Sequence, residues 1–117
     1  MTTILYGINN CDTIKKTKKW LKEHDITFDF HDYRKNGIDS SLVKMLMDQL
    51  GWENIINKRG LTYRQLSAEQ KDNLTETSSI AILVEYPAMI KRPILKKDGQ
   101  LFIGFNQDEY SELFNMN

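Results

Sequence analysis

The first residues of the chain pass from a short apolar run to a helical spacing. Residues 3–6 (Thr-Ile-Leu-Tyr) combine β-branched and aromatic side chains, which predicts a short buried strand that ends at Gly7. The next residues, Ile-Asn-Asn, predict a tight loop. From residue 11 to about residue 23 apolar side chains recur at helical spacing, and an Asp-Thr pair suits the first turn. The pattern therefore places Cys11 where a strand passes into a helix N-terminus.

A second strand follows. Residues 26–33 alternate apolar and polar side chains, with Ile26, Phe28 and Phe30 on one face. A strand, a helix and a second strand form a βαβ unit, in which we expect parallel strands and a right-handed crossover.

The middle of the chain is predicted to be helical throughout. Asp39 or Ser40 caps a helix that ends at Gly51, with an apolar stripe formed by Leu42, Val43, Leu46, Met47 and Leu50. Short helical turns are expected over residues 52–56 and 62–66, on either side of a basic loop at 57–60.

Two further helices complete this region. Ser67 and Gln70 form a capping box that opens a helix to about residue 74. Thr77 or Ser78 is expected to cap the next helix, which Pro87 ends.

Strands return at the end of the chain. Residues 94–96 and 101–105 flank an Asp98-Gly99 pair, which predicts a β-hairpin. Asn106 then caps a final helix over residues 107–114. The order βαβ, helical block, ββα predicts an α/β fold of the thioredoxin-like kind, with a mixed four-stranded sheet and an all-helical insertion. We expect a single domain over residues 1–117, with a core of about 1–35 and 88–117 and an insertion of about 36–87.

Composition limits the classes of function. The 117 residues suffice for one packed core, and 16 basic residues balance 16 acidic ones. A net charge of zero argues against a nucleic-acid partner or an anionic membrane surface. No apolar run approaches the ~18 residues of a membrane span, and one cysteine excludes an internal disulfide and argues against a cysteine-ligated metal. We therefore expect a monomer of the cytoplasm without a tightly bound cofactor.

Cys11 is the candidate nucleophile. Unpaired N–H groups at a helix N-terminus favour a thiolate, and Lys15 lies one turn further on. The alternative is that Cys11 is a small buried hydrophobic residue, and that the lysines of this helix form a solvated face.

A second motif points to the same corner of the sheet. In open sheets, ligands bind beyond the carboxyl end of the first strand, where Cys11 is expected. Pro93 precedes a strand, where a cis bond would shape a loop beside the thiol and present Arg92 to an anion. Arg59 is the candidate for a second positive group. The alternative for Arg92 is a surface arginine without a role.

These residues resemble a known family. The segments Ile-Leu-Tyr-Gly at 4–7, Asn-Cys-Asp-Thr at 10–13, His-Asp-Tyr-Arg at 31–34 and Lys-Arg-Pro-Ile at 91–94 are similar to the arsenate reductase (ArsC)/Spx family, most of all to its YffB-like branch. The resemblance runs from Met1 to about Phe114. It implies a glutathione-dependent reductase in which Cys11 is the nucleophile and Arg92 holds an oxyanion, with glutathione as co-substrate and glutaredoxin as a further partner. Asn10, Lys15, Arg59 and Pro93 are the candidate substrate-binding residues.

Two departures from the family pattern bear on the substrate. Asn57 stands where the resemblance implies an arginine, and the arginine after the last strand is replaced near Gly104. Two of three oxyanion arginines are thus missing or displaced, which argues against arsenate. The Spx branch, which binds the RNA polymerase alpha subunit, typically has a Cys-x-x-Cys switch, whereas Ile14 stands at the second position here. A non-catalytic protein-binding regulator and a glutathionylated redox sensor are the alternatives to the reductase.

Overall fold

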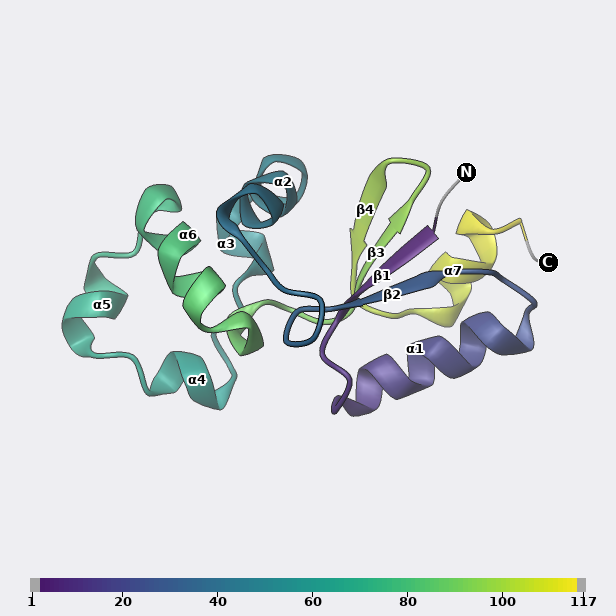
Figure 1. Ribbon diagram of the computed structural model, residues 1–117, viewed down its shortest axis with the longest axis horizontal. Helices are drawn as coiled ribbons and strands as arrows, with labels where there is room; N and C mark the ends of the chain where they lie inside the picture. Colours follow the sequence, from purple (N-terminus) through teal and green to yellow (C-terminus); the bar gives the residue numbers. More distant parts are fainter. Residues whose placement is uncertain (1–2, 116–117) are drawn as a thin grey trace. The chain divides into compact units, whose positions relative to one another are not determined.

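The computed structural model describes residues 3–115, which form two compact units (Figure 1). Unit 1 contains the chain up to Asp32 and again from Arg92, and unit 2 is Tyr33–Lys91. Within residues 3–115, no helix has both the length and the apolar character needed to cross a membrane. The prediction that both units belong to one domain stays a prediction.

Unit 1 is built on a mixed four-stranded sheet of order β2-β1-β3-β4. Strand β1 is parallel to β2 and antiparallel to β3, and β3 is antiparallel to β4, so the predicted sheet is confirmed. Its elements are β1 (Thr3–Gly7), α1 (Asp12–Glu23), β2 (Asp29–Asp32), β3 (Ile94–Lys97), β4 (Gln100–Ile103) and α7 (Gln107–Leu113).

The second strand is shorter than the sequence pattern predicts. It begins at Asp29 rather than at residue 26, and the end of α1 explains why Ile26 is not part of it. Asp25 adopts a left-handed φ of 57°, and the Ile26 N–H donates to the Leu21 carbonyl at 2.9 Å. These features form a Schellman helix end, which keeps Ile26 out of the sheet.

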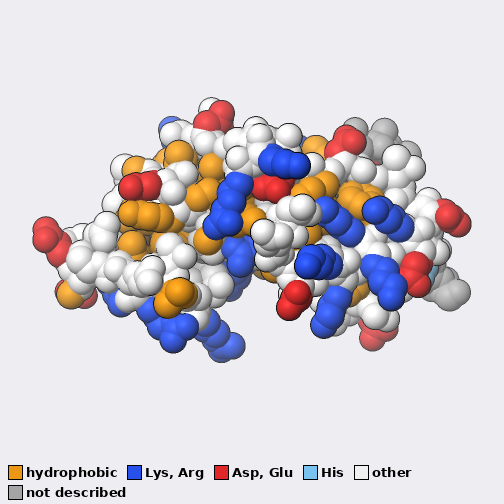
Figure 2. All heavy atoms as spheres, turned by 60° about the horizontal axis from the view of Figure 1, so that its bottom comes forward, with side chains coloured by type: hydrophobic (Ala, Val, Ile, Leu, Met, Phe, Trp, Pro, Cys, Tyr) orange, Lys and Arg blue, Asp and Glu red, His pale blue; other side chains and the backbone are white. Residues whose placement is uncertain are grey.

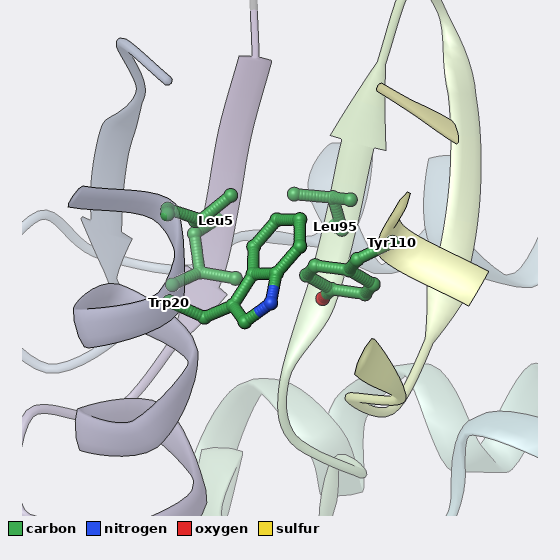
Figure 3. Packing of buried hydrophobic residues seen from close by; sticks show 5 residues of the cluster. Leu5, Trp20, Leu95 and Tyr110 are labelled. Atoms are coloured by element: carbon green, nitrogen blue, oxygen red, sulfur yellow. The ribbon is translucent and has the colours of Figure 1, made fainter. Parts of the chain in front are cut away.

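The core of unit 1 joins both of its helices to one face of the sheet. Leu5 of β1 is the register partner of Leu95 in β3, and Trp20 and Tyr110 from the two helices lie over this pair (Figure 3). The rings of Trp20 and Tyr110 meet edge to face, with centroids 5.6 Å apart. Leu21 completes this buried cluster. Edge-to-face aromatic packing adds to the burial energy and fixes α1 and α7 relative to the strands.

A close contact sets the position at which α1 begins. Gly7 ends β1, and a Cβ atom at this position would collide with Cδ1 of Ile14. Gly7 has no positive φ, so the reason for a glycine here is the room that it leaves for the Ile14 side chain. The contact brings the first turn of α1 directly against the end of the first strand.

The C-terminal part of unit 1 follows the predicted turn chemistry. Asp98 and Gly99 take positive φ values of 52° and 84°, as a two-residue hairpin turn requires. The Asn106 side chain accepts a hydrogen bond from the Glu109 N–H at 2.9 Å and caps α7. Both predictions are confirmed.

Unit 2 consists of helices, as predicted, with one isolated bridge between Ile56 and Ile90. Asp39 caps the first of them, and the predicted Ser67–Gln70 capping box is present. The elements are α2 (Ser40–Leu50), α3 (Trp52–Ile55), α4 (Leu61–Arg64), α5 (Ala68–Asp72), α6 (Glu76–Glu85) and the 3₁₀ helix η1 (Pro87–Met89).

The cap of α6 differs from the prediction. Thr75, rather than Thr77 or Ser78, is the N-cap, and it accepts from the Ser78 N–H while the Ser78 hydroxyl accepts from the Thr75 N–H. Serine in the third helical position replaces the usual Glu or Gln of a capping box, so the box was not recognised in the sequence.

Substitution of Gly7 by alanine should destabilise the fold. Overpacking of this kind costs about 1–3 kcal/mol, to be measured as a loss in the free energy of unfolding by denaturant titration. Ile14→Val removes the colliding Cδ1 atom and alone costs about 0.5–1.5 kcal/mol. The double variant should lose less free energy of unfolding than the two single variants lose together, because the clash is relieved. Full additivity would show that Gly7 and Ile14 do not share this contact.

Candidate active site

Cys11 occupies the N-cap of α1, immediately after the loop that leaves β1. Its backbone is extended, with φ −126° and ψ 128°, and its carbonyl accepts the first helical hydrogen bond from the Lys15 N–H at 3.0 Å. The residue is partly exposed. The position predicted from the sequence is therefore observed, and the thiol is not enclosed in the apolar core.

The surroundings of the sulfur favour its ionised form. Burial opposes ionisation, but the N–H groups of Ile14 and Thr13 and the Arg92 side chain favour the thiolate, and the Arg92 charge also attracts it. Their combined effect lowers the pKa of the Cys11 thiol from its ordinary value. The thiol forms no regular capping hydrogen bond, yet these N–H groups lie close enough to stabilise a thiolate.

The loop before Cys11 is tied to both neighbouring elements. The Asn9 N–H donates to the Asp32 carboxylate at the end of β2, at 3.3 Å. The Asn9 side-chain oxygen accepts from Lys18 Nζ at 3.0 Å, and the same ammonium lies 3.7 Å from the centroid of the Phe30 ring. These contacts restrain the path of the chain into Cys11.

Arg92 is held by a turn that is anchored in the core. The Arg92–Pro93 peptide bond is cis, as hypothesised, and the Pro93 carbonyl accepts from the Gly104 N–H at 2.8 Å. The Gly104 carbonyl accepts from the Tyr110 hydroxyl at 3.1 Å. Burial, with a smaller contribution from Glu109, raises the pKa of Tyr110, so its hydroxyl is a donor at neutral pH.

The predicted site residues fall into two groups. Cys11 and Arg92 interact directly, and buried Pro93 adjoins Arg92. Asn10 and Lys15, which precede and follow Cys11 in the chain, are exposed, and their predicted contacts with substrate stay predictions. Arg59 belongs to unit 2, and its contribution to the thiol site also stays a prediction.

The surroundings of Arg59 are basic. It lines an open pocket of unit 2 with a volume of about 570 Å³. The other lining residues are Glu53, Asn54, Ile56, Asn57, Lys58 and Lys91. The Asn57 side-chain oxygen accepts from the Arg59 N–H at 3.1 Å and shapes this loop.

Several residues that support the site were not singled out in the sequence. Asn9, Gly104 and Tyr110 act through backbone groups or across the sheet, so no local spacing indicates them. Asp32 is different, because a carboxylate at the end of a strand is itself a signal, and it falls within the quoted motif at residues 31–34.

A mixed four-stranded sheet with a partly exposed thiol at the helix N-terminus after its first strand is an arrangement of the thioredoxin-like fold. A solved mutant of the thioredoxin-like protein BC3987 shares this fold with a TM-score of 0.51 at 16% identity, over 99% of this chain and 97% of that one. The chain belongs to the ArsC family, whose model matches residues 6–113.

Curated relatives of two kinds match nearly the whole chain. An uncharacterized protein of Haemophilus influenzae is 44% identical over 110 residues, covering 94% of this chain and 96% of the relative. The global transcriptional regulator Spx of Lactiplantibacillus plantarum is 30% identical over 108 residues, covering 91% and 81%. The predicted ArsC/Spx relationship is thus confirmed.

Solved structures agree with this assignment. The YffB (PA3664) protein matches with a TM-score of 0.89 at 41% identity, over 95% of this chain and 97% of that one. An arsenate reductase (ArsC) related protein from Brucella melitensis matches with a TM-score of 0.79 at 38% identity, over 97% and 95%. The chain is therefore similar to an arsenate reductase (ArsC) related protein over nearly its whole length.

Replacement of Arg92 by glutamine should raise the pKa of Cys11, because both a hydrogen bond and a positive charge to the thiolate are lost. The pH dependence of alkylation by iodoacetamide measures this pKa as the midpoint of the rate profile. Lys91→Gln is the matched control, since it removes the adjacent positive charge. A midpoint that moves equally in both variants would contradict a specific role for Arg92.

Tyr110→Phe should act on the same midpoint from inside the core. Loss of the hydroxyl removes one hydrogen bond, worth about 0.5–1.5 kcal/mol in the free energy of unfolding. It should also move the Cys11 midpoint in the same direction as Arg92→Gln, by a smaller amount, because the turn that holds Arg92 loosens. Destabilisation without any change in the midpoint would show that Tyr110 serves the core alone.

Proposed function

We propose that the chain is a glutathione-dependent thiol oxidoreductase in which the Cys11 thiolate is the nucleophile. The observation that supports this most directly is the partly exposed sulfur between two helix N–H groups and the Arg92 guanidinium. Membership of the ArsC family supports it independently. A cytoplasmic location would supply reduced glutathione in excess.

The chemistry of a single thiol follows from disulfide exchange. The Cys11 thiolate attacks one sulfur of an oxidised substrate disulfide, and the other sulfur leaves as a thiolate with the electron pair of the broken bond. A glutathione thiolate then releases the second substrate thiol and forms a Cys11–glutathione disulfide. A second glutathione restores Cys11, so two glutathione molecules are oxidised to one disulfide while the substrate disulfide is reduced. Since Cys11 is the only cysteine, an external thiol must complete the cycle.

Arg92 has a distinct task in this cycle. Its guanidinium stabilises the thiolate before attack and, once the mixed disulfide has formed, it is available to a carboxylate of glutathione. Glutaredoxin, the further partner implied by the family, would resolve the mixed disulfide by the same exchange. Asn57 in place of an oxyanion arginine argues against arsenate as the substrate.

The folded protein should form a mixed disulfide with glutathione disulfide faster at neutral pH than the same chain in denaturant. The lowered pKa of Cys11 is a property of the folded state, so unfolding reduces the thiolate fraction. Intact-mass spectrometry follows the adduct over time, and Cys11→Ser shows that it forms at this sulfur. An equal or slower rate in the folded protein would refute the proposal.

A second candidate function is a protein-binding regulator. It is favoured by the 30% identity to a protein named global transcriptional regulator Spx over most of the chain. Binding of the purified RNA polymerase alpha subunit to the wild-type chain and to Cys11→Ser separates the two functions. A stoichiometric complex retained by Cys11→Ser, without reductase activity of the wild type, would favour the regulator. A Cys11 that only accepts glutathione, without turnover, would indicate the redox sensor instead.

A further inference from the structure

The exposed face of α1 carries a row of lysines that begins beside the thiol. Lys15, Lys19 and Lys22 are all exposed and follow each other at spacings of four and three residues, so they share one face of the helix. We call these three residues the lysine stripe. Figure 2, which brings this side of the molecule forward, shows basic side chains gathered over α1.

The charge of this stripe is only partly balanced by its neighbours on α1. None of its three lysines forms an ion pair with another described residue, whereas Lys97 pairs with Asp98 at 3.0 Å. The two carboxylates of α1, Asp12 and Glu23, lie three residues before Lys15 and four residues after Lys19, so they offset only part of the charge of the five lysines of this helix. Like charges three and four residues apart destabilise a helix, so the stripe is an electrostatic cost that an acidic partner would offset.

The other two lysines of α1, Lys16 and Lys18, differ from the stripe in position or in contacts. Lys18 is engaged with the Asn9 side chain and the Phe30 ring, so it has a structural task within unit 1. Lys16 and the stripe residue Lys19 both line a shallow cavity, together with Trp20, Glu23, Phe105 and Gln107. Among residues 3–115, the stripe residues form no hydrogen bond or ring contact like those of Lys18, and they extend in line from the helix end that holds Cys11.

The length of the stripe indicates the size of its ligand. At about 1.5 Å per residue, Lys22 lies roughly 16 Å along the helix axis from Cys11. Charges are screened beyond about 8 Å at physiological ionic strength, so Lys19 and Lys22 would act weakly on a small anion at the sulfur. A peptide segment lying along the helix would contact them directly.

We propose that the lysine stripe is a docking surface for an acidic segment of a protein whose disulfide reacts with Cys11. This inference rests on the proposed function and specifies its substrate class as an acidic protein disulfide. In the reaction, the Cys11 thiolate forms a new bond to the segment's cysteine sulfur. The original disulfide bond breaks, and its other sulfur leaves as a thiolate with the bonding electrons. Cys11 is oxidised to the mixed disulfide and the leaving sulfur is reduced.

Synthetic peptides test the preference directly. Each begins with a cysteine activated as a 2-pyridyl disulfide and continues for about six residues, enough to span the stripe at roughly 3.3 Å per extended residue. One peptide is rich in aspartate and the other in serine, and release of thiopyridone is followed by absorbance. The acidic peptide should react about tenfold faster at low salt, and the advantage should disappear at high salt.

Charge reversal locates the effect. Lys19→Glu with Lys22→Glu should abolish the advantage of the acidic peptide and leave the rate of the serine peptide unchanged. The matched control is Lys96→Glu with Lys97→Glu, which changes the net charge equally on β3. Lys97 is paired in register with Thr3, at the end of β1 away from Cys11. This control should keep most of the advantage.

Each contrary result has a clear meaning. Equal rates for the two peptides with the wild type, or an equal loss in both double variants, would overturn the lysine stripe as a docking surface. A serine peptide that fails to react at neutral pH would instead overturn the nucleophile on which the inference rests.

Discussion

The contact between Gly7 and Ile14 is the constraint on which the thiol site depends. It places the first turn of α1 against the last residue of β1, so the amide groups of Thr13 and Ile14 can face a side chain at position 11. The contact holds because Trp20 and Leu21 fix the same helix against the sheet further along. The site thus depends on how α1 packs against the sheet, and its electrostatics follow from the position of the N-terminus of this helix.

The Arg92 side of the site is supported differently. There the connection runs from the core outward, from the Tyr110 hydroxyl through the Gly104 backbone to the Pro93 carbonyl. The same aromatic side chain packs against Trp20, which anchors α1. One buried residue therefore contacts both structures that deliver groups to the sulfur, so interior packing and site geometry are linked.

Local sequence signals predicted the parts of this architecture that depend on short-range chemistry. The Asp98-Gly99 hairpin, the cap at Asn106 and the Ser67 capping box follow from side chains that bond to nearby backbone. The prediction of β2 failed at its start because a Schellman end cannot be recognised from alternation alone. The α6 cap was misplaced because Ser78 takes the position usually held by a longer side chain.

Within the candidate site, Cys11 and Arg92 could be named from the sequence, because each lies beside a strand end. Its supports could not, since the restraint of the loop by Asn9 and Asp32 joins residues 23 positions apart and required the parallel pairing of β1 and β2 to be known.

The single sulfur has one more implication. A protein with two neighbouring thiols can close an internal disulfide and discard its partner, whereas here reversible oxidation to a disulfide leaves another molecule attached to Cys11. In the oxidised state, the molecule joined to Cys11 is therefore the one with which the sulfur last reacted. Rapid acid quenching of intact cells would preserve this mixed disulfide, so the attached group could be identified directly from its mass.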